Sequence, residues 1–270
     1  HHTQFVFWCM NQNRYHFLVN KKLYLLHIYT CLLLKYCKHW QLDKRFKDWV
    51  ETANYFCSTL VDRIVSGYPK EREDEILTAL GYTDQLLVAG EYYHSWIIQG
   101  PRLVQKELPF YRSTLNVTFV DDLAPYREMK VRILNGAHTA MVPISILYGN
   151  NTVKETIDNE FTGDFINKAV FNEIIETLKM DRNELTSFAD AVFDRFRNPF
   201  IKHQLADIAL NSISKFKVRV LPSLIEYIDL HSKVPTNLTF AFACLIRFYK
   251  GVWQGKTLPI KDSAEIVEAF

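Results

Sequence analysis

Three polar side chains that could act together on one small molecule lie in an otherwise apolar, helix-like stretch, KVRILNGAHT. They are Lys130, Asn135 and His138. At about 100° per residue, the three fall within one broad face of a helix. A lysine in a partly dry pocket can act as a general acid or base near neutral pH, because burial weakens its preference for the charged form. An amide and a neutral imidazole can hydrogen-bond an oxygen whose charge changes during hydride transfer.

The same spacing is also compatible with a purely structural role. Lys130 would then be solvated, Asn135 and Gly136 would mark a helix irregularity, and His138 would be a core histidine with its hydrogen bonds satisfied. Triples of this kind arise easily by chance. Residue spacing alone therefore leaves both interpretations open.

A second group of polar and basic residues follows in the segment RFRNPFIKH. Its candidate substrate-binding residues are Arg195, Asn198, Lys202 and His203. Arginine binds carboxylates through two parallel hydrogen bonds, which suits an acidic sugar. The structural alternative is a basic helix end that is capped before Pro199.

A third polar group lies in the segment FCSTLVDRIV, where Ser58 is the candidate substrate-binding residue. We expect a helix over 41–56, then a connection and the start of another helix over 57–65. On that helix Asp62 and Arg63 are adjacent and do not face each other. The structural alternative is the surface start of a helix.

The composition excludes several classes of protein. The chain has 270 residues, 48% of them hydrophobic, and 32 Lys and Arg against 30 Asp and Glu, for a net charge of +2. These values indicate one large or two small domains with a real core, and no general nucleic-acid binder. The five cysteines include no C-x-x-C pair, so we expect neither a disulfide framework nor a zinc knuckle, and a reducing, cytoplasmic location. No paired-histidine spacing predicts a metal site.

The first 40 residues differ from the rest, because they hold five Lys and Arg and no Asp or Glu. Their longest apolar run, Leu23 to Leu34, has 12 residues. A membrane helix needs roughly 20, so we expect no membrane segment. We interpret residues 1–32 as an atypical lead-in, truncated or frame-shifted, and expect it to pack poorly.

Hydrophobic patterns divide the rest of the chain into a mixed part and a helical part. A charged helix is expected over 70–80, ending at Gly81, and strands over Tyr92–Ile98 and Leu115–Val120. From about residue 126 the apolar period becomes 3.6, and no strand is expected after about residue 125. The apolar helical stripes lie within 164–178, 185–196, 205–213, 224–228 and 238–248.

Several long segments resemble the polyol-specific long-chain dehydrogenases, the mannitol dehydrogenase family, and most of all its tagaturonate reductase branch. The segments are FCSTLVDRIVSGYP, IIQGP, NVTFVDDLAPYREMKVRILNGAHTAMVP, FADAVFDRFRNPFIKHQLADIALNSISKF and LPSLIEY. The match runs from about residue 33 to 262. The family pattern K-x-x-x-x-N-x-x-H falls on Lys130, Asn135 and His138, and R-F-x-N-P begins at Arg195. The mannitol-type members carry asparagine about where this chain has Ser58, which favours the uronate branch.

The resemblance implies NAD-dependent, metal-independent hydride transfer between D-tagaturonate and D-altronate. Lys130 would be the general acid/base, and Asn135 and His138 would position the reacting carbonyl. It further implies a mainly α fold, with an all-helical C-terminal substrate domain (126–270) preceded by the incomplete α/β edge of a Rossmann domain (33–125). The expected partner is a small sugar acid.

The chain departs from the family in its nucleotide-binding part. No two of its nine glycines are spaced G-x-G, so the dinucleotide-binding fingerprint is missing. We therefore expect this fragment to be inactive alone. Three alternatives stay open: a fructuronate or mannitol-type substrate, a non-catalytic sugar-acid-binding remnant, and a helical interaction protein.

Overall fold

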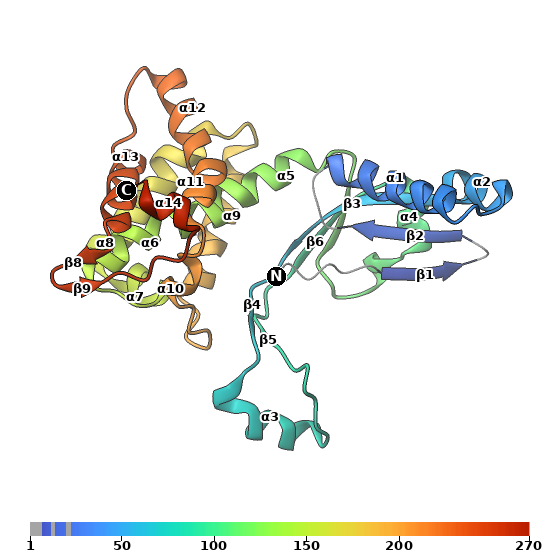
Figure 1. Ribbon diagram of the computed structural model, residues 1–270, viewed down its shortest axis with the longest axis horizontal. Coiled ribbons are helices and arrows are strands. Elements are labelled where there is room, and N and C mark those ends of the chain that lie inside the picture. Colours follow the sequence, from blue (N-terminus) through green and yellow to red (C-terminus); the bar gives the residue numbers. More distant parts are fainter. Residues whose placement is uncertain (1–6, 12–13, 20–22, 270) are drawn as a thin grey trace. The chain divides into compact units, whose positions relative to one another are not determined.

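The computed structural model describes residues 7–11, 14–19 and 23–269, and gives side-chain surroundings from residue 31 on, apart from Ser66 (Figure 1). The chain forms two compact units. The sheet unit comprises residues 1–65 and 90–127, and the helical unit comprises residues 66–89 and 128–270. Within the described residues, no helix is both long enough and apolar enough to cross a membrane.

A five-stranded mixed sheet in the order β1-β2-β3-β6-β7 organises the first unit. Its strands are β1 (Phe7–Asn11), β2 (Arg14–Val19), β3 (Asn54–Asp62), β6 (Ser95–Gln99) and β7 (Val117–Val120). The β2–β3 and β6–β7 pairs are parallel, whereas β1–β2 and β3–β6 are antiparallel. The long central strand β3 runs beside β6 in Figure 1. The strands expected within Tyr92–Ile98 and Leu115–Val120 are therefore confirmed, as β6 and β7.

The helix expected to start at Cys57 is wrong, because these residues form the centre of strand β3. The expected first helix is also too long, since α2 (Lys44–Thr52) ends before β3 begins. A strand that is paired on both sides and covered on both faces reads as a continuous apolar run instead of an alternating one. Such a run cannot be told from a buried helix by periodicity alone.

The core of the sheet unit lies between β3, β6 and the helix that follows Pro101. Its buried residues are Cys57, Ile98, Val104 and Leu108. A Cβ atom on Gly100 would lie 2.8 Å from the Cys57 Sγ atom, so only glycine fits beside this thiol. The helical segments of this unit are α1 (Leu23–His39), α2, α4 (Arg102–Glu107), η2 (Phe110–Arg112) and the start of α5 (Ala124–Met129).

The expectation that residues 1–32 pack poorly falls on side chains that mostly lie outside the described residues. The structure places backbone strands β1 and β2 and the start of α1 in this segment. The packing expectation therefore stays a prediction.

The helical unit is built around one largely buried helix, α6 (Gly136–Tyr148). Every residue of α6 from Gly136 to Ser145 is buried, which is expected of a helix that is apolar on all sides. Helices α8, α10, α11 and α13 pack against it. The helices of the unit are α3 (Glu73–Leu80), α6, α7 (Val153–Asp158), α8 (Glu160–Lys168), α9 (Arg182–Phe196), α10 (Leu205–Ile208), α11 (Ser212–Arg219), α12 (Leu221–His231), α13 (Thr236–Tyr249) and α14 (Ala264–Glu268).

Short non-α turns interrupt these helices and connect them. They are η1 (Lys70–Arg72), η3 (Lys130–Asn135), η4 (Ala169–Ile174) and η5 (Ile175–Thr177), of which η3 and η4 are π-helical. The expected helical stripes within 185–196, 224–228 and 238–248 and the helix end at Gly81 are confirmed, whereas the stretch 164–178 passes from α8 into η4 and η5, and 205–213 is divided between α10 and α11. Short strands β4 (Val65–Gly67) and β5 (Ala89–Gly90) flank the segment that holds α3. A two-stranded hairpin of β8 (Val252–Trp253) and β9 (Lys256–Thr257) corrects the expectation of no strand after residue 125.

A buried carboxylate fixes the start of α13 on the π-helical turn η4. Glu173 accepts hydrogen bonds from the backbone N–H groups of Asn237 and Leu238, both at 2.8 Å. These donors belong to the first turn of α13 and would otherwise have no intrahelical partner. The negative charge also lies at the positive end of the helix dipole. Helix α13 is thereby held against the layer that carries α6.

Candidate active site

Lys130 and Asn135 are the first and last residues of the π-helical turn η3, which joins α5 to α6. The N–H of Gly136 donates to the Val131 carbonyl, which is the i→i+5 bond of a π turn. A π turn holds more residues per turn than an α-helix. A residue five positions further along the chain therefore lies closer to the same side of the helix as the first residue. Single π turns inside helices are frequent at functional sites. The helix irregularity considered as a structural alternative is therefore real, and it gathers the two polar side chains.

A buried arginine anchors this turn to helix α12. The Arg132 guanidinium donates to both carboxylate oxygens of Glu226, at 3.0 and 2.8 Å, and to the Ser223 hydroxyl at 3.0 Å. It also donates to Glu128 at 2.8 Å. Two parallel hydrogen bonds fix direction as well as distance. The turn that carries Lys130 and Asn135 is thus tied to helix α12, which lies much later in the sequence.

A close backbone contact sets the distance between α6 and α11. A Cβ atom on Gly136 would lie 3.1 Å from the carbonyl oxygen of Arg219, so glycine lets α11 approach. One turn further along α6, the Thr139 hydroxyl donates to the Asn135 carbonyl at 2.8 Å. The Arg219 Nη1 atom lies 3.5 Å from that same hydroxyl oxygen. The π turn, α6 and α11 therefore meet at one point.

His138 is a buried histidine whose Nε2 atom has no hydrogen-bond partner within the described chain. The residue as a whole is 7% exposed. Phe196 packs on the ring at a centroid distance of 4.4 Å, and His203 meets it edge-on at 5.0 Å. A buried polar atom without a partner costs free energy, which a substrate hydroxyl or carbonyl would recover. The structural alternative of a satisfied core histidine does not describe this atom.

The His138 imidazole is neutral near pH 7, for two reasons that act in the same direction. Burial is the larger cause and lowers its pKa well below the usual value. The neighbouring basic groups of His203, Arg219, Arg195 and Lys215 lower the pKa further. A neutral imidazole can hydrogen-bond a substrate oxygen without carrying a charge of its own.

The basic groups around His138 come from three separate segments of the helical unit. Arg195 is 9% exposed on α9, and His203 follows in the loop before α10. Lys215 and Arg219 lie four residues apart on α11. Lys215 and Arg219 are not among the site residues predicted from the sequence. Their K-x-x-x-R spacing could have indicated them, because residues four apart share one face of a helix.

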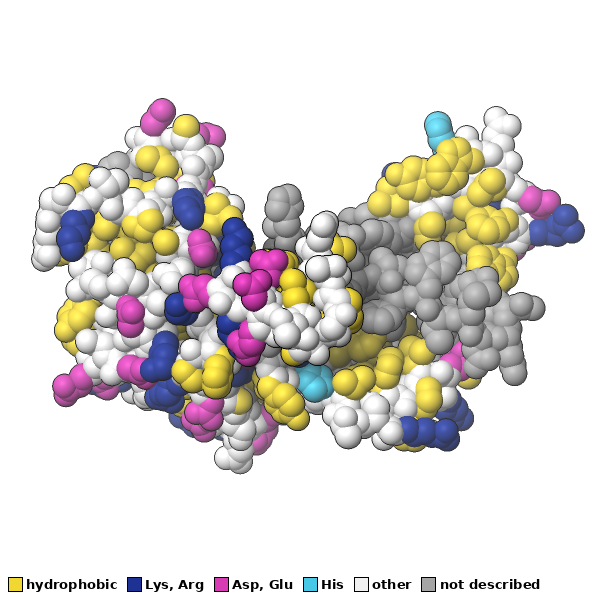
Figure 2. Space-filling model, turned by 90° about the horizontal axis from the view of Figure 1, so that it is seen from below, with side chains coloured by type: hydrophobic (Ala, Val, Ile, Leu, Met, Phe, Trp, Pro, Cys, Tyr) yellow, Lys and Arg dark blue, Asp and Glu magenta, His cyan; other side chains and the backbone are white. Residues whose placement is uncertain are grey.

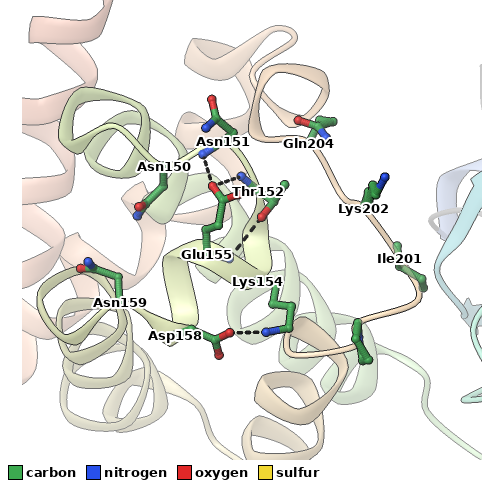
Figure 3. A pocket seen from close by; sticks show the side chains of 11 residues that line it. Asn150, Asn151, Thr152, Lys154, Glu155, Asp158, Asn159, Ile201, Lys202 and Gln204 are labelled. Atoms are coloured by element: carbon green, nitrogen blue, oxygen red, sulfur yellow. Dashed lines mark hydrogen bonds and ion pairs between the residues drawn. The ribbon is translucent and has the colours of Figure 1, made fainter.

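Two other residues predicted to bind substrate have different surroundings, since Lys202 lines a separate pocket and Asn198 shapes a turn. Lys202 is exposed, and its Nζ atom lies 2.9 Å from Glu71 Oε2. It lines a pocket of about 630 Å³ together with Thr152 and Glu155, whose reciprocal cap is drawn in Figure 3. The residues that line this pocket do not include Lys130, His138 or Arg195. Asn198 accepts a hydrogen bond from the Phe200 N–H at 3.0 Å and shapes the turn after α9.

Ser58 belongs to the sheet unit, where it lies on strand β3. It is 2% exposed, and its hydroxyl has no hydrogen-bond partner among the described residues. The substrate-binding roles of Ser58, Asn198 and Lys202 stay predictions.

The visible surface of the helical unit is not uniformly basic. On the face of the helical unit seen in Figure 2, Lys and Arg side chains are interspersed with Asp and Glu. This agrees with the net charge of +2 for the whole chain. The site is therefore a local concentration of positive charge, suited to a small anion more than to an extended polyanion.

Two family models match the chain in successive segments. Residues 27–111 match the mannitol dehydrogenase Rossmann domain, and residues 122–268 match the mannitol dehydrogenase C-terminal domain. Two solved structures share the fold. The Pseudomonas fluorescens mannitol 2-dehydrogenase ternary complex with NAD and D-mannitol has a TM-score of 0.65 and 24% identity, over 84% of this chain and 46% of that chain. A D-sorbitol dehydrogenase in substrate-free form has a TM-score of 0.74 and 23% identity, over 91% and 50%.

Curated relatives are more similar in sequence. The altronate oxidoreductases of Yersinia enterocolitica and of Escherichia coli O6:K15:H31 are each 47% identical over 239 residues, which is 88% of this chain. The chain spans about half the length of these relatives, since the match covers 50% of each. Because the C-terminal family model alone covers more than half of its residues, the chain belongs to the mannitol dehydrogenase family.

Proposed function

We propose that this chain carries the substrate-binding and proton-transfer part of an NAD-dependent oxidoreductase that interconverts D-tagaturonate and D-altronate. The observation that carries the proposal is the neutral, buried His138, with an unpartnered Nε2 atom and four positive groups around it. The neutral imidazole can hydrogen-bond an uncharged substrate oxygen. The basic groups favour a substrate that also bears a negative charge. The relatives named altronate oxidoreductase support the same substrate class.

In this proposal the π turn supplies the proton and α6 orients the substrate. Lys130 donates a proton to the substrate oxygen as the keto group becomes a hydroxyl, and takes it back in the reverse direction. Asn135 and His138 hydrogen-bond that oxygen and hold it in place. Arg195 binds a substrate oxygen from α9, where burial strengthens its charge-assisted hydrogen bonds.

The residues of this chain do not provide a complete site for NAD. A dinucleotide-binding turn needs glycines spaced G-x-G-x-x-G between a strand and a helix. The nine glycines of the chain include no G-x-G pair. No residue is therefore assigned to the cofactor. This observation favours a second candidate function, which is binding of a sugar acid without hydride transfer.

Calorimetric titration of the 270-residue chain with D-altronate, D-tagaturonate, D-fructuronate and D-mannitol tests the proposal. We expect saturable binding of D-altronate and D-tagaturonate, with D-mannitol weaker. Absence of binding by any sugar acid would overturn the proposed function. Tighter binding of D-fructuronate or D-mannitol would assign the chain to another branch of the family.

A parallel titration with NADH, followed by its fluorescence, separates the two candidate functions. Binding of NADH together with NADH-dependent reduction of D-tagaturonate supports the oxidoreductase. Binding of D-altronate without any binding of NADH supports the sugar-acid-binding role.

A further inference from the structure

Helix α11 presents a charged group to the His138 site for which the described side chains supply no counter-charge. Burial lowers the pKa of Arg219, which nonetheless keeps its charge, as arginine does in proteins. In the part of the chain whose side chains are described, no carboxylate lies within ion-pair distance of Arg219. Among the described residues, its one hydrogen-bond contact is the long one to Thr139, at 3.5 Å. Arg219 is half-buried, and a partly desolvated cation without an anion is costly, so the site is built for an anion that arrives from outside.

Lys215 lies one helical turn before Arg219 and adds to the same positive field. Its Nζ atom donates to the Ile208 carbonyl at 2.8 Å, which fixes the direction of the side chain. Burial and the neighbouring Arg219 both lower the pKa of Lys215, while Asp262 acts in the opposite direction. Asp262 also accepts a hydrogen bond from the Tyr249 hydroxyl at 2.6 Å, so its charge is shared. Lys215 is thus partly balanced, and Arg219 is the stronger anion site.

The position of Arg219 is fixed relative to the residues proposed for proton transfer. Its backbone carbonyl rests against Gly136, directly after Asn135, and its guanidinium lies beside Thr139, directly after His138. A substrate whose reacting oxygen lies at His138 therefore has a guanidinium available for a second, charged group. Arg195 lies on α9 and His203 in the loop before α10, so the basic groups that act on His138 come from three separate segments.

We propose that Arg219, supported by Lys215, binds the carboxylate of the substrate and makes the site selective for sugar acids over neutral polyols. This inference rests on the proposed function and extends it to a residue that sets specificity. The guanidinium fork matches the two oxygens of a carboxylate, whereas a neutral polyol offers no charge to offset the desolvation of Arg219.

The test compares the affinities of the 270-residue chain for D-altronate and for D-mannitol, by calorimetry. In Arg219→Gln, we expect D-altronate binding to weaken roughly 10- to 100-fold, the usual effect of losing a hydrogen-bonded charge partner, with little change for D-mannitol. Lys217→Gln is the matched control, because Lys217 is an exposed cation on the same helix. The control variant should bind both compounds like the unchanged chain.

The ratio of the two affinities within one variant separates specificity from general damage to the fold. If Arg219→Gln does not fold, Arg219→Lys replaces it, since it keeps the charge but loses the two-pronged geometry, and a lowered ratio is again expected. An unchanged ratio in the folded variant, while the parent chain binds D-altronate, would overturn the role of Arg219 and leave the proposed function intact. Failure of the parent chain to bind D-altronate would overturn both.

Discussion

The ring of His203 meets the ring of His138 edge-on, at a centroid distance of 5.0 Å, inside the helical unit. One histidine comes from the buried part of helix α6 and the other from the loop that leads into α10. Both can carry a positive charge, and neither can do so next to the other without repulsion. The pair therefore links the protonation of the site to the stability of the fold.

We expect the chain to lose stability as the pH falls below about 6.5, the ordinary pKa of histidine, because of His138. Its pKa is lowered in the folded state, so the unfolded chain binds more protons in the window between the two values. The free energy of unfolding then falls as the pH falls, and this contribution is fully present only above about 6.5. The groups that face His138 and maintain the shift are His203, Arg219, Arg195 and Lys215.

Urea unfolding at about pH 5 and about pH 7.5 measures this effect, with His138→Gln as the test variant. The difference in unfolding free energy between the two pH values should shrink in His138→Gln. The matched control is His231→Gln, at an exposed position near the end of α12, which should keep the parent difference. A His138→Gln variant with the parent pH dependence would contradict the prediction.

Lys130→Ala should abolish proton transfer while leaving sugar-acid binding largely intact. Removing a general acid/base costs roughly 10²- to 10⁴-fold in rate. The rate is followed as NADH oxidation in the presence of D-tagaturonate, in a version of the protein extended to the full length of its relatives. Binding is followed by calorimetric titration with D-altronate. Lys168→Ala is the control, since Lys168 is an exposed residue at the end of α8 that pairs with Asp164 at 2.6 Å. An NADH oxidation rate in Lys130→Ala equal to that of the control would sink the assignment of Lys130.

Local sequence patterns predicted the helical unit well and the sheet unit less well. The apolar stripes of α9, α12 and α13 follow a 3.6 period, because each helix buries one face. Strand β3 was missed because it is paired on both sides and shows no alternation around Cys57. Its partners β2 and β6 are distant in sequence, and a local pattern carries no information about them.

The candidate site shows the same division between local and long-range information. The spacing of Lys130, Asn135 and His138 indicates one shared site. An ideal α-helix would separate Lys130 and Asn135 by about 140° around its axis, and the π turn reduces this angle. Arg219 was not selected because its role depends on contacts with Gly136 and Thr139, about 80 residues earlier in the chain. Such contacts become visible only when α6 and α11 are packed.

Gly136→Ala should destabilise the helical unit and weaken D-altronate binding together. The added methyl group would lie 3.1 Å from the Arg219 carbonyl oxygen, so α11 must move away from α6. Overpacking costs about 1–3 kcal/mol, and better helix propensity returns up to about 1 kcal/mol, so we expect a net loss of about 1 kcal/mol. Thermal and urea unfolding measure the first effect, and calorimetry the second.

Gly90→Ala is the control for this substitution, because a Cβ atom there meets its nearest neighbour, Arg63 Nε, at an ordinary 3.4 Å. It should change the free energy of unfolding by no more than about 0.5 kcal/mol. Equal effects of the two substitutions would show that the contact between Gly136 and Arg219 has no special importance.

Arg132→Met should loosen the π turn and lower the free energy of unfolding by about 1–3 kcal/mol. The substitution removes four hydrogen bonds that tie η3 to Glu226, Ser223 and Glu128. The loss stays below that of a fully buried ion pair, because both glutamates reach solvent and can be hydrated again.

The control is Arg182→Met, which breaks an exposed ion pair with Glu176 and should cost less than about 1 kcal/mol. Urea unfolding of both variants measures the difference. In a version of the protein extended to the full length of its relatives, slower NADH-dependent turnover is expected in Arg132→Met alone if the π turn positions Lys130. A stability loss in Arg132→Met no greater than in Arg182→Met would show that this network does not hold the turn.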